Sequence, residues 1–458
     1  MISLDTEKVV MKALSKDPHN RFASVQEFAY ALEQTATPPT GAVICTYCGH
    51  SESVISLAWS PNSRYIVSYV EDRVHVWEAT TGHKTFTFER DPLASLLGPG
   101  SLVACSPNGE SIAFYAEKTV RIWDLDEGRQ TFAYSEQSEK VDSVVWLADG
   151  FHALSKIEDG YGKKIKFWNL LGDQSIVCHA FREIYDPICS PDGKFIAGNL
   201  ISYSGNEDDG YEPVNGGVIV WSATTGNEVL YYWCSDNSGG NNILTWSPDS
   251  RYIASADGDF QVWDVISKRQ VIAKDVTMNI DAISWAPNGK YIAYVDGEGD
   301  IQIWDITAGS TIFTYRGHMY KNNKGGYTLS ADNVAWSPDS RRIASTGYTD
   351  NTVHVWDATT GDNAVICRDH PFSKQARPFN HLVEWSPDCN FIVTATRNGD
   401  ESKDCTVHVW DALTGNISYT FREQSGKVDA LAWSRDGKYI ASAGDDKTVR
   451  VWVAPLFT

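Results

Sequence analysis

One short apolar stretch that ends in tryptophan recurs nine times in the chain and limits the folds that the chain can adopt. It reads Val-His-Val-Trp at residues 74–77 and Val-Arg-Val-Trp at residues 449–452. Successive tryptophans lie 41 to 54 residues apart. Such self-similarity is typical of repeat architectures, in which each unit buries its apolar surface against its neighbours. The tryptophans are therefore predicted to be structural: Trp77, Trp123, Trp168, Trp221, Trp263, Trp304, Trp356, Trp410 and Trp452.

Each repeat contains a second landmark, an apolar strand that runs into a turn of the type Trp-Ser-Pro-Asp, as at Trp246 and Trp336. Proline presets φ at the start of this turn, and Asp or Asn tolerates the conformations of a tight hairpin. A second strand follows, the tryptophan strand is the third, and a turn such as residues 79–82 leads to a fourth. The pattern predicts four short antiparallel strands per repeat, arranged as blades around a central channel.

These units resemble WD40 repeats over about residues 42–454, and five copies keep the Trp-Asp dipeptide. The resemblance implies an all-β, WD40-type β-propeller with nine four-stranded blades. In that family a His, an Asp, a Ser or Thr and a Trp form a hydrogen-bonded network within a blade. Only some positions match here: His50 and His318 after glycine, Ser345 and Ser442 in second strands, and Asp350, Asp404 and Asp446 before the tryptophan strand.

The two ends of the repeat region indicate how the propeller closes. The last unit ends after Trp452 without a fourth strand, and residues 42–47 precede the first unit as a spare strand. We expect the spare strand to complete the last blade, which would remove two free edges and close a single ring. A split into two rings remains an alternative, but each ring would need its own closing strand.

Residues 1–34 show a helical period instead of a strand period. Asp17-Pro18 ends a first helix, because proline cannot continue the hydrogen-bond ladder. Ser24 and Glu27 have the spacing of a capping box for a second helix. Residues 35–41, with two prolines, are predicted to be a linker to a domain at 42–458. The residues around Arg21 in this hairpin resemble part of a known family.

The stretch from Leu14 to Phe22 resembles the final helices of bacterial Ser/Thr protein kinase domains of the eukaryotic type. In that family the arginine matching Arg21 pairs with a glutamate that this chain lacks, so we expect a loosely held hairpin or one packed on the propeller rim. The glycine-rich loop, the catalytic loop and the Asp-Phe-Gly motif are missing, so no kinase activity is expected. The hairpin is either the remnant of a kinase–propeller gene or a docking element.

The net charge and the amino-acid composition limit the classes of partner that we expect this chain to bind. The net charge of -20 disfavours phosphate backbones and anionic lipid, so neither nucleic acid nor a membrane is an expected partner. The N-terminus has no basic-then-apolar signal peptide, and no run of 18 apolar residues is present. Nine irregularly spaced cysteines favour reduced thiols in a cytoplasmic protein. The pair Cys45 and Cys48 lacks a second pair, so we expect no metal and no cofactor.

Most insertions fall in the second-to-third turns and in the links between blades, which a four-stranded meander places on one face. They cover residues 158–164, 199–217, 318–332, 368–381 and 397–404. Long loops on a rigid scaffold usually carry recognition, and aromatic and arginine side chains anchor interfaces. The predicted binding residues are Tyr161, Tyr203, Tyr211, Tyr320, Tyr327, Phe372, Arg377 and Phe379.

The sequence thus favours a non-enzymatic scaffold or sensor that binds protein or peptide on this long-loop face. The resemblance to kinases adds a Ser/Thr kinase or its substrates as partners. The alternative is an enzyme or a metal-dependent ligand-binding propeller that uses the central channel, because carboxylates lining such a channel cannot be located by sequence.

Overall fold

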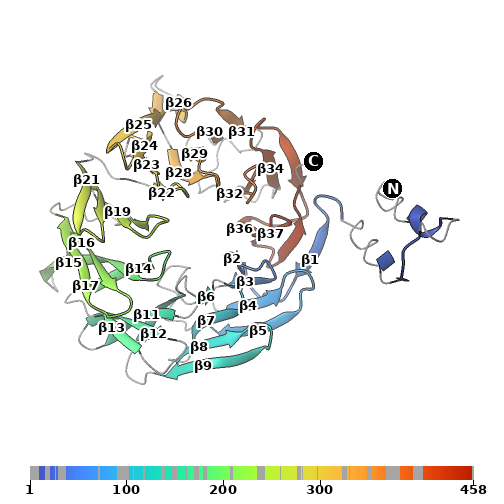
Figure 1. Ribbon diagram of the computed structural model, residues 1–458, viewed down its shortest axis with the longest axis horizontal. Coiled ribbons are helices and arrows are strands. Elements are labelled where there is room, and N and C mark those ends of the chain that lie inside the picture. Colours follow the sequence, from blue (N-terminus) through green and yellow to red (C-terminus); the bar gives the residue numbers. More distant parts are fainter. Residues whose placement is uncertain are drawn as a thin grey trace.

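The computed structural model describes residues 10–15, 21–25, 27–28, 38–70, 73–89, 103–106, 108–116, 119–135, 140–146, 152–159, 162–169, 175–178, 183–206, 210–234, 243–257, 259–275, 280, 282–296, 298–321, 327–329, 331–347, 352–367, 382–395 and 406–455. Over these residues the protein is an all-β, propeller-like molecule with very little helix. Antiparallel sheets of four strands follow one another around a common centre (Figure 1).

The strands of the first five sheets succeed each other in chain order. They are β2 (Ser56–Trp59), β3 (Tyr65–Tyr69), β4 (Arg73–Glu78) and β5 (Lys84–Glu89); β6 (Val103–Cys105), β7 (Ser111–Ala116), β8 (Thr119–Asp124) and β9 (Arg129–Ser135); β10 (Lys140–Trp146), β11 (His152–Asp159), β12 (Gly162–Asn169) and β13 (Ser175–Cys178); β14 (Glu183–Cys189), β15 (Phe195–Asn206), β16 (Gly210–Ser222) and β17 (Glu228–Cys234); β18 (Ile243–Trp246), β19 (Tyr252–Asp257), β20 (Asp259–Asp264) and β21 (Arg269–Asp275).

The later sheets follow the same plan, with one small hairpin inserted and the first strand of the chain added at the end. They are β22 (Ala282–Trp285), β23 (Tyr291–Val295), β24 (Ile301–Asp305) and β25 (Ser310–Tyr315); the hairpin β26 (Met319–Lys321) and β27 (Tyr327–Leu329); β28 (Ala331–Trp336), β29 (Arg342–Gly347), β30 (Val353–Asp357) and β31 (Val365–Cys367); β32 (Leu382–Trp385), β33 (Phe391–Ala395), β34 (Val407–Asp411) and β35 (Ile417–Phe421); β36 (Val428–Trp433), β37 (Tyr439–Gly444) and β38 (Val449–Val453), beside β1 (Val43–Tyr47).

The two ends of the repeat region meet in one sheet, whose strand order is β1-β38-β37-β36. The amide of Gly41 donates to the Val453 carbonyl at 2.8 Å, and the amide of Val453 donates to the Ala42 carbonyl at 3.0 Å. The turn after Glu78 in the first sheet contains the same two backbone bonds. The amide of Gly82 donates to the Glu78 carbonyl, and the amide of Glu78 donates to the His83 carbonyl, each at 2.9 Å. Two separate chain segments therefore reproduce a third-to-fourth turn.

The recurring tryptophan strand lies in the interior of each sheet. Five of its tryptophans are at most 1% exposed: Trp77, Trp221, Trp356, Trp410 and Trp452. Apolar residues of adjacent sheets pack together, as Ile66 and Trp77 do with Ala441 and Val451 of the sheet that contains the chain end. Burial between neighbouring sheets, rather than within one sheet, therefore forms the core.

The Trp-Asp dipeptide has a local role. In each of its five copies the aspartate Oδ1 accepts backbone N–H groups two and three residues further on, as Asp357 does from Thr359 at 2.9 Å and Thr360 at 3.1 Å. The same arrangement is found at Asp124, Asp264, Asp305 and Asp411. The aspartate thus stabilises the third-to-fourth turn, as a short carboxylate at the start of a turn can.

The Trp-Ser-Pro-Asp landmark joins neighbouring sheets. The indole N–H of the tryptophan donates to a backbone carbonyl of the innermost strand in the preceding sheet, as Trp385 does to Ala335 at 3.2 Å. The same bond is made by Trp59, Trp246, Trp285 and Trp336. Trp433 differs, because its buried indole nitrogen has no hydrogen-bond partner.

The N-terminal helical residues lie apart from the four-stranded sheets (Figure 1). The amide of Glu27 donates to Ser24 Oγ at 3.0 Å, as the predicted capping box requires, whereas Glu27 Oε2 accepts the amide of Ala23 at 2.7 Å instead of that of Ser24. Arg21 Nε donates to the Ser15 carbonyl at 2.7 Å. The predicted boundaries at residues 34 and 41 stay predictions.

Three insertions that we expected to be loops are strands. Residues 199–217 belong mostly to β15 and β16, residues 318–332 contain β26 and β27, and residues 158–164 are mostly the ends of β11 and β12. The expectation of loops was wrong there. A polar hairpin can continue the pairing of the strands that carry it, as at 158–164 and 199–217, or form a separate two-stranded sheet, as β26 and β27 do. The insertions at 368–381 and 397–404 lie outside the described residues.

Candidate functional site

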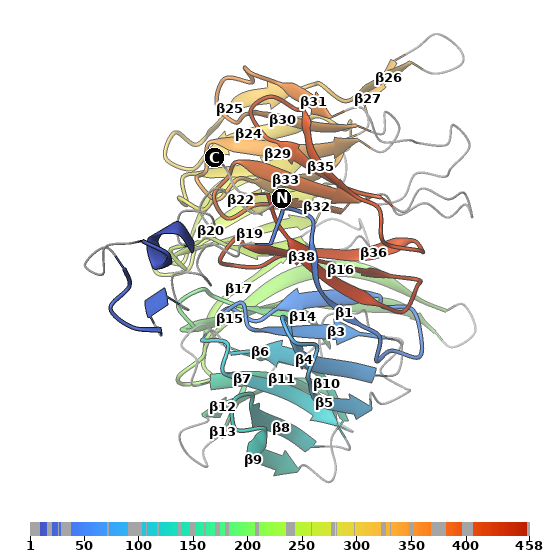
Figure 2. The same ribbon diagram turned by 90° about the vertical axis from the view of Figure 1, so that its right-hand side faces the viewer.

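The long-loop face is defined by the second-to-third turns and the links between sheets. Since consecutive strands are antiparallel, these connections lie at one end of the sheets, and the first-to-second and third-to-fourth turns lie at the other. The hairpin β26–β27 stands out from the sheets at the upper right of Figure 2. It belongs to a link between two sheets, so it marks the long-loop face.

The largest structured element on this face is a ribbon formed by β15 and β16. The two strands pair from Phe195↔Ser222 to Asn206↔Gly210, with a bulge between Ser202 and Tyr203. The far end of this pairing, residues 202–206 and 210–215, lies beyond the paired parts of β14 and β17. We call these residues the β15–β16 ribbon. An insertion thus becomes a defined surface instead of an open loop.

The predicted binding residues divide into two groups. Tyr203 and Tyr211 belong to the β15–β16 ribbon, where they pair with Pro213 and Gly205. The hairpin β26–β27 carries two further tyrosines in successive cross-strand pairs, Tyr320 with Thr328 and Tyr327 with Lys321. The remaining four, Tyr161, Phe372, Arg377 and Phe379, lie outside the described residues.

A buried polar network lies where a sheet-to-sheet link enters the first sheet. His50 Nε2 and Ser68 Oγ are 2.9 Å apart, and the indole of Trp77 donates to the same hydroxyl at 3.0 Å. The Tyr47 hydroxyl and His75 Nδ1 are 2.7 Å apart, and the Tyr47 and Trp77 rings stack at 4.6 Å. The link is therefore fixed to strands β3 and β4 through side chains.

The sheet of β28–β31 repeats this network residue for residue. His318 Nε2 lies 2.9 Å from Ser345 Oγ, to which Trp356 donates at 3.1 Å. Tyr315 and His354 Nδ1 are 2.7 Å apart, and the two histidine rings stack at 4.0 Å. The link that carries the hairpin β26–β27 starts at this network, so the hairpin has a rigid base.

The last sheet makes an equivalent network from different residues. Ser442 Oγ donates to Gln424 Oε1 at 3.0 Å, and Gln424 Nε2 donates to Asp446 Oδ1 at 2.9 Å. Arg450 forms an ion pair with Asp446 at 2.5 Å. Glutamine therefore takes the place of the first histidine, and arginine the place of the second. Asp446 and Ser442 have the predicted positions, whereas Asp350 and Asp404 lie outside the described residues.

Burial determines whether the serine and histidine side chains of these networks can react with a substrate. Ser68 is fully buried and His50 is 7% exposed, so no substrate reaches the serine–histidine pair. Burial, and then the neighbouring His75, lowers the pKa of His50 to about 3. Burial also raises the pKa of Tyr47 to about 12. In the first sheet, His50 and Tyr47 are therefore neutral near pH 7, and the buried Ser68–His50 pair braces the link instead of forming a nucleophilic dyad.

Sequence reasoning missed part of these networks. No place in these networks was predicted for His75, His354, Tyr47 or Tyr315. A signal was present, because an aromatic residue stands three positions before the histidine in both Tyr47-Cys-Gly-His50 and Tyr315-Arg-Gly-His318. A histidine two positions before tryptophan completes the pattern in both repeats.

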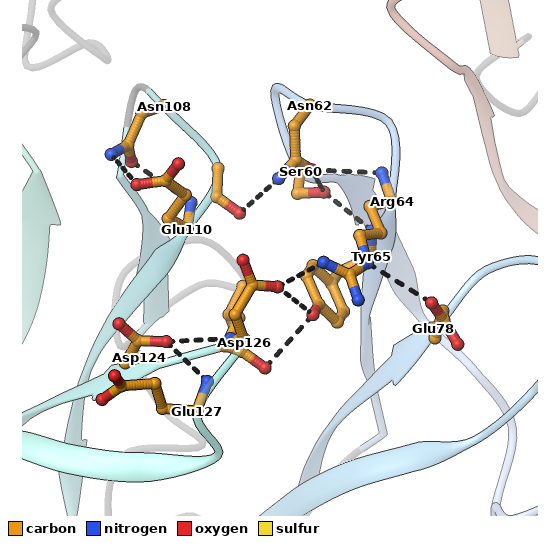
Figure 3. A network of polar contacts seen from close by, with 12 residues as sticks. Ser60, Asn62, Arg64, Tyr65, Glu78, Asn108, Glu110, Asp124, Asp126 and Glu127 are labelled. Atoms are coloured by element: carbon orange, nitrogen blue, oxygen red, sulfur yellow. Dashed lines mark hydrogen bonds and ion pairs between the residues drawn. The ribbon is translucent and has the colours of Figure 1, made fainter.

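The opposite face joins sheets through exposed polar groups. Figure 3 shows Arg64 between Glu78 and Asp126, which belong to two different sheets. The Tyr65 hydroxyl donates to Asp126 at 2.8 Å, and burial, followed by this bond, raises the pKa of Tyr65 to about 12. These groups are engaged with one another, so this part of the tight-turn face is a structural contact between neighbouring sheets.

The described parts of the chain were compared with the requirements of a metal site and of a membrane-spanning helix. No group of three or more potential metal ligands occurs there, and Cys45 is partly buried whereas Cys48 is exposed. No helix of those parts combines the length and the apolar character that a bilayer crossing requires.

Comparison with known proteins identifies WD40 repeats in this propeller-like fold. The family model described as WD domain, G-beta repeat matches residues 41–78, 309–357, 374–411 and 415–453. The model described as eukaryotic translation initiation factor eIF2A matches residues 227–327. Two solved structures share the fold: the designed protein Ika8, with a TM-score of 0.51, 18% identity and coverage of 90% of this chain and 100% of that one, and the C-terminal WD40 domain of Sif2, with a TM-score of 0.54, 13% identity and coverage of 91% and 98%.

Relatives of known name are similar over different lengths. A guanine nucleotide-binding protein subunit beta from Oryza sativa subsp. indica is 24% identical over 92% of this chain and 87% of its own length. Cell division cycle 20.1, cofactor of APC complex, from Arabidopsis thaliana is 25% identical over 49% of this chain and 47% of its own length. Autophagy-related protein 16 from the same plant is 25% identical over 50% of this chain and 44% of its own length. For these last two, the match spans less than half of the relative.

Proposed function

We propose that this protein is a non-enzymatic scaffold or sensor that binds a protein or peptide on its long-loop face. The observation that supports the proposal is that rigid, buried hydrogen-bond networks and structured insertions occur together at that face. His318 and His354 fix the link from which the hairpin β26–β27 rises, and the β15–β16 ribbon continues a buried sheet. Such a scaffold presents aromatic residues at low entropic cost. The names of two relatives agree with the scaffold function, because one is a guanine nucleotide-binding protein subunit and the other is a cofactor of the APC complex.

The proposed architecture is one closed ring of nine blades, completed by residues 42–47. Pairing of β1 with β38 supports closure at the chain ends. The amide of Val54 also donates to the Gly444 carbonyl at 3.1 Å, which joins the last sheet to the first. A ring whose sheets keep only short edges suits a molecule that displays loops without self-association.

We further propose that the chain acts in the cytoplasm beside a Ser/Thr kinase or its substrates, as the sensor or docking half of a bacterial kinase–propeller protein. The kinase-like residues 14–22 support this origin. An upstream reading frame that encodes the missing kinase motifs would support a remnant. If residues 1–34 can be deleted without loss of any partner, the hairpin is not a docking element.

The test of the scaffold function is capture of partners by the full chain. A variant in which Tyr203, Tyr211, Tyr320 and Tyr327 are changed to alanine should lose partners that the wild type retains. Leu413→Ala is the matched control, because Leu413 is 61% exposed but follows β34 on the tight-turn face. Retention of every partner by the tyrosine variant, or equal loss in the control, would contradict the assignment to the long-loop face.

One observation favours the alternative of chemistry in the central channel. Glu384 is an exposed carboxylate on β32, the innermost strand of its sheet, yet protein surrounds it and raises its pKa to about 7. A carboxyl group that titrates near neutral pH suits general acid–base work. A substrate screen should detect turnover that Glu384→Gln abolishes if the channel is catalytic. Equal behaviour of the two proteins would remove this alternative.

A further inference from the structure

Glu384 differs in charge from the residues that occupy the same position in the other sheets. The position is the second-to-last of the first strand, the strand nearest the common centre, as β32 and β36 show in Figure 1. The equivalent residues of the other first strands that the structure describes are uncharged: Ala58, Ala104, Val145, Ile188, Thr245, Ser284, Ala335 and Ala432. Among these strands, Glu384 alone places a charged group at this level of the inner surface.

The surroundings of Glu384 contain no described group that compensates its charge. The side chain is exposed, although β32 is the innermost strand of its sheet. β33 places Val393 opposite it, and β28 and β36, which contact β32, carry Ala335 and Ala432 at the equivalent level. Surrounding protein alone raises the pKa of the carboxyl group to about 7, and no hydrogen bond or charge of the described residues offsets this effect. The ionised carboxylate has thus lost hydration without gaining a partner in this part of the chain.

The backbone of Glu384 also departs from the repeat. In five sheets the indole N–H of a tryptophan donates to the carbonyl of the equivalent residue in the preceding sheet, as Trp385 does to Ala335 at 3.2 Å. Trp433 is the indole that follows Glu384 in this order, and it lies on β36, which contacts β32. Its buried nitrogen has no hydrogen-bond partner among the described residues. The Glu384 carbonyl therefore lacks the indole donor that its equivalents have, so two departures from the repeat fall on one residue.

The chemistry of this position favours an organic cation over a metal ion. A metal ion requires several oxygen, nitrogen or sulfur ligands, and the described residues contain no group of three potential ligands. An ammonium or guanidinium group can bind to a single carboxylate, because its N–H groups donate charge-assisted hydrogen bonds. The equivalent residues on the two neighbouring strands, Ala335 and Ala432, have no polar side-chain atom, so the carboxylate of Glu384 is the acceptor.

We propose that Glu384 binds a single organic cation with N–H donors, an alkylammonium or a guanidinium group, on the inner surface of the sheets. The cation belongs either to a free amine or to a lysine or arginine side chain of a partner. Glu384 immediately precedes Trp385 and the first-to-second turn, so the site lies towards the tight-turn face. The inference goes beyond the proposed function, because it requires neither the long-loop face nor turnover at the carboxyl group.

Small cations and a peptide are the probes, and saturation-transfer NMR on the full chain is the measurement. Butylammonium and butylguanidinium represent a free cation, and a short peptide with one central lysine and both ends blocked represents a partner. Butanol is the neutral control. Glu384→Gln removes the charge at nearly constant shape. Glu423→Gln is the matched variant, because it removes one charge at an exposed residue in the link between β35 and β36. Thermal unfolding of both variants checks that the fold is unchanged.

We expect butylammonium or butylguanidinium to bind to the wild type and to Glu423→Gln, at least about fivefold more weakly to Glu384→Gln, and butanol not to bind. Lowering the pH from 8 to 6 should weaken binding to the wild type about tenfold, because a carboxyl group of pKa about 7 becomes mostly protonated while carboxylates of ordinary pKa stay ionised. This pH series needs no variant, so it tests the site in the native chain.

Equal binding to the wild type and to Glu384→Gln, an equal loss in Glu423→Gln, binding that does not change with pH, or no binding of any probe would each overturn the inference. Peptide binding at least as tight as that of the free cations assigns the site to a side chain of a partner. Binding of the free cations alone assigns it to a small amine. The scaffold function is judged separately by the capture experiment, which leaves Glu384 unchanged.

Discussion

The amide of Gly41 donates a hydrogen bond of 2.8 Å to the carbonyl of Val453, although the two residues lie near opposite ends of the chain. The bond copies the one between Gly82 and Glu78 within a continuous turn. Gly41 has a φ of 79°, and a Cβ there would lie 1.8 Å from the Tyr419 ring. The segment before β1 therefore supplies a turn glycine as well as a strand to the last sheet.

Removal of β1 should destabilise the whole ring. A chain that begins at residue 48 lacks the pairing of Tyr47 with Val449 and the stacking of Tyr47 on Trp77, whereas a chain that begins at residue 38 keeps both. We expect the shorter chain to melt well below the longer one and to aggregate, because the edge of β38 becomes free. Differential scanning calorimetry and light scattering measure this. Equal melting of the two chains would show that β1 does not close the ring.

Two glycines with a similar positive φ allow the cost of backbone strain to be measured separately from the cost of a steric clash. Gly361 has a φ of 69° and Gly309 a φ of 64°, so an alanine at either position costs about 1–2 kcal/mol of backbone energy. A Cβ at Gly361 would lie 2.0 Å from the Phe313 ring of the preceding sheet, whereas nothing lies within 4 Å at Gly309. Chemical denaturation should show Gly361→Ala to be more destabilising than Gly309→Ala by about 1–3 kcal/mol. Equal destabilisation by the two substitutions would show that the contact with Phe313 does not affect stability.

The tryptophan bonds between sheets can be tested at one bonded and one unbonded position. Trp385 and Trp433 are each 8% exposed, but only Trp385 donates its indole N–H, at 3.2 Å to Ala335. Phenylalanine removes the donor at both sites. We expect Trp385→Phe to lower the free energy of unfolding by about 1 kcal/mol more than Trp433→Phe, because the latter also removes an unsatisfied buried donor. Urea denaturation measures the difference, and a reversed order would count against the ladder of indole bonds.

Acid should weaken the first sheet through His50. Its pKa falls from an ordinary value of 6.5 to about 3 in the folded protein, so the unfolded chain binds the proton first as the pH is lowered. Stability is therefore lost as the pH drops from about 6.5 towards 3, by up to about 1.4 kcal/mol per pH unit for one group. The loss ends where the folded protein is protonated too.

His50→Gln is the informative variant, because Gln424 already holds the equivalent place beside Ser442 at 3.0 Å. The glutamine keeps a partner for Ser68 but cannot be protonated. Between pH 6.5 and 4, the free energy of unfolding of this variant should depend less steeply on pH than that of the wild type. Parallel pH profiles would mean that His50 does not titrate on unfolding.

Much of the repeat structure could be predicted from residues that act locally. The turn at Asp357 follows from a carboxylate that reaches amides two and three positions away, so the sequence alone contains the information. The four-strand unit around each tryptophan is predictable for the same reason. The insertion at 199–217 lengthens a second-to-third turn, which predicts a loop, yet pairing between its two halves extends the strands.

The sequence by itself determined the repeat, its turns and the aromatic residues of the insertions, because these depend on contacts within a few positions of the chain. Only the tertiary structure decided that Tyr47 meets His75, that the tryptophans join one sheet to the next, and that β15 and β16 pair through the insertion at 199–217. These features depend on which strands lie side by side. That arrangement follows from packing between sheets, which no local pattern encodes.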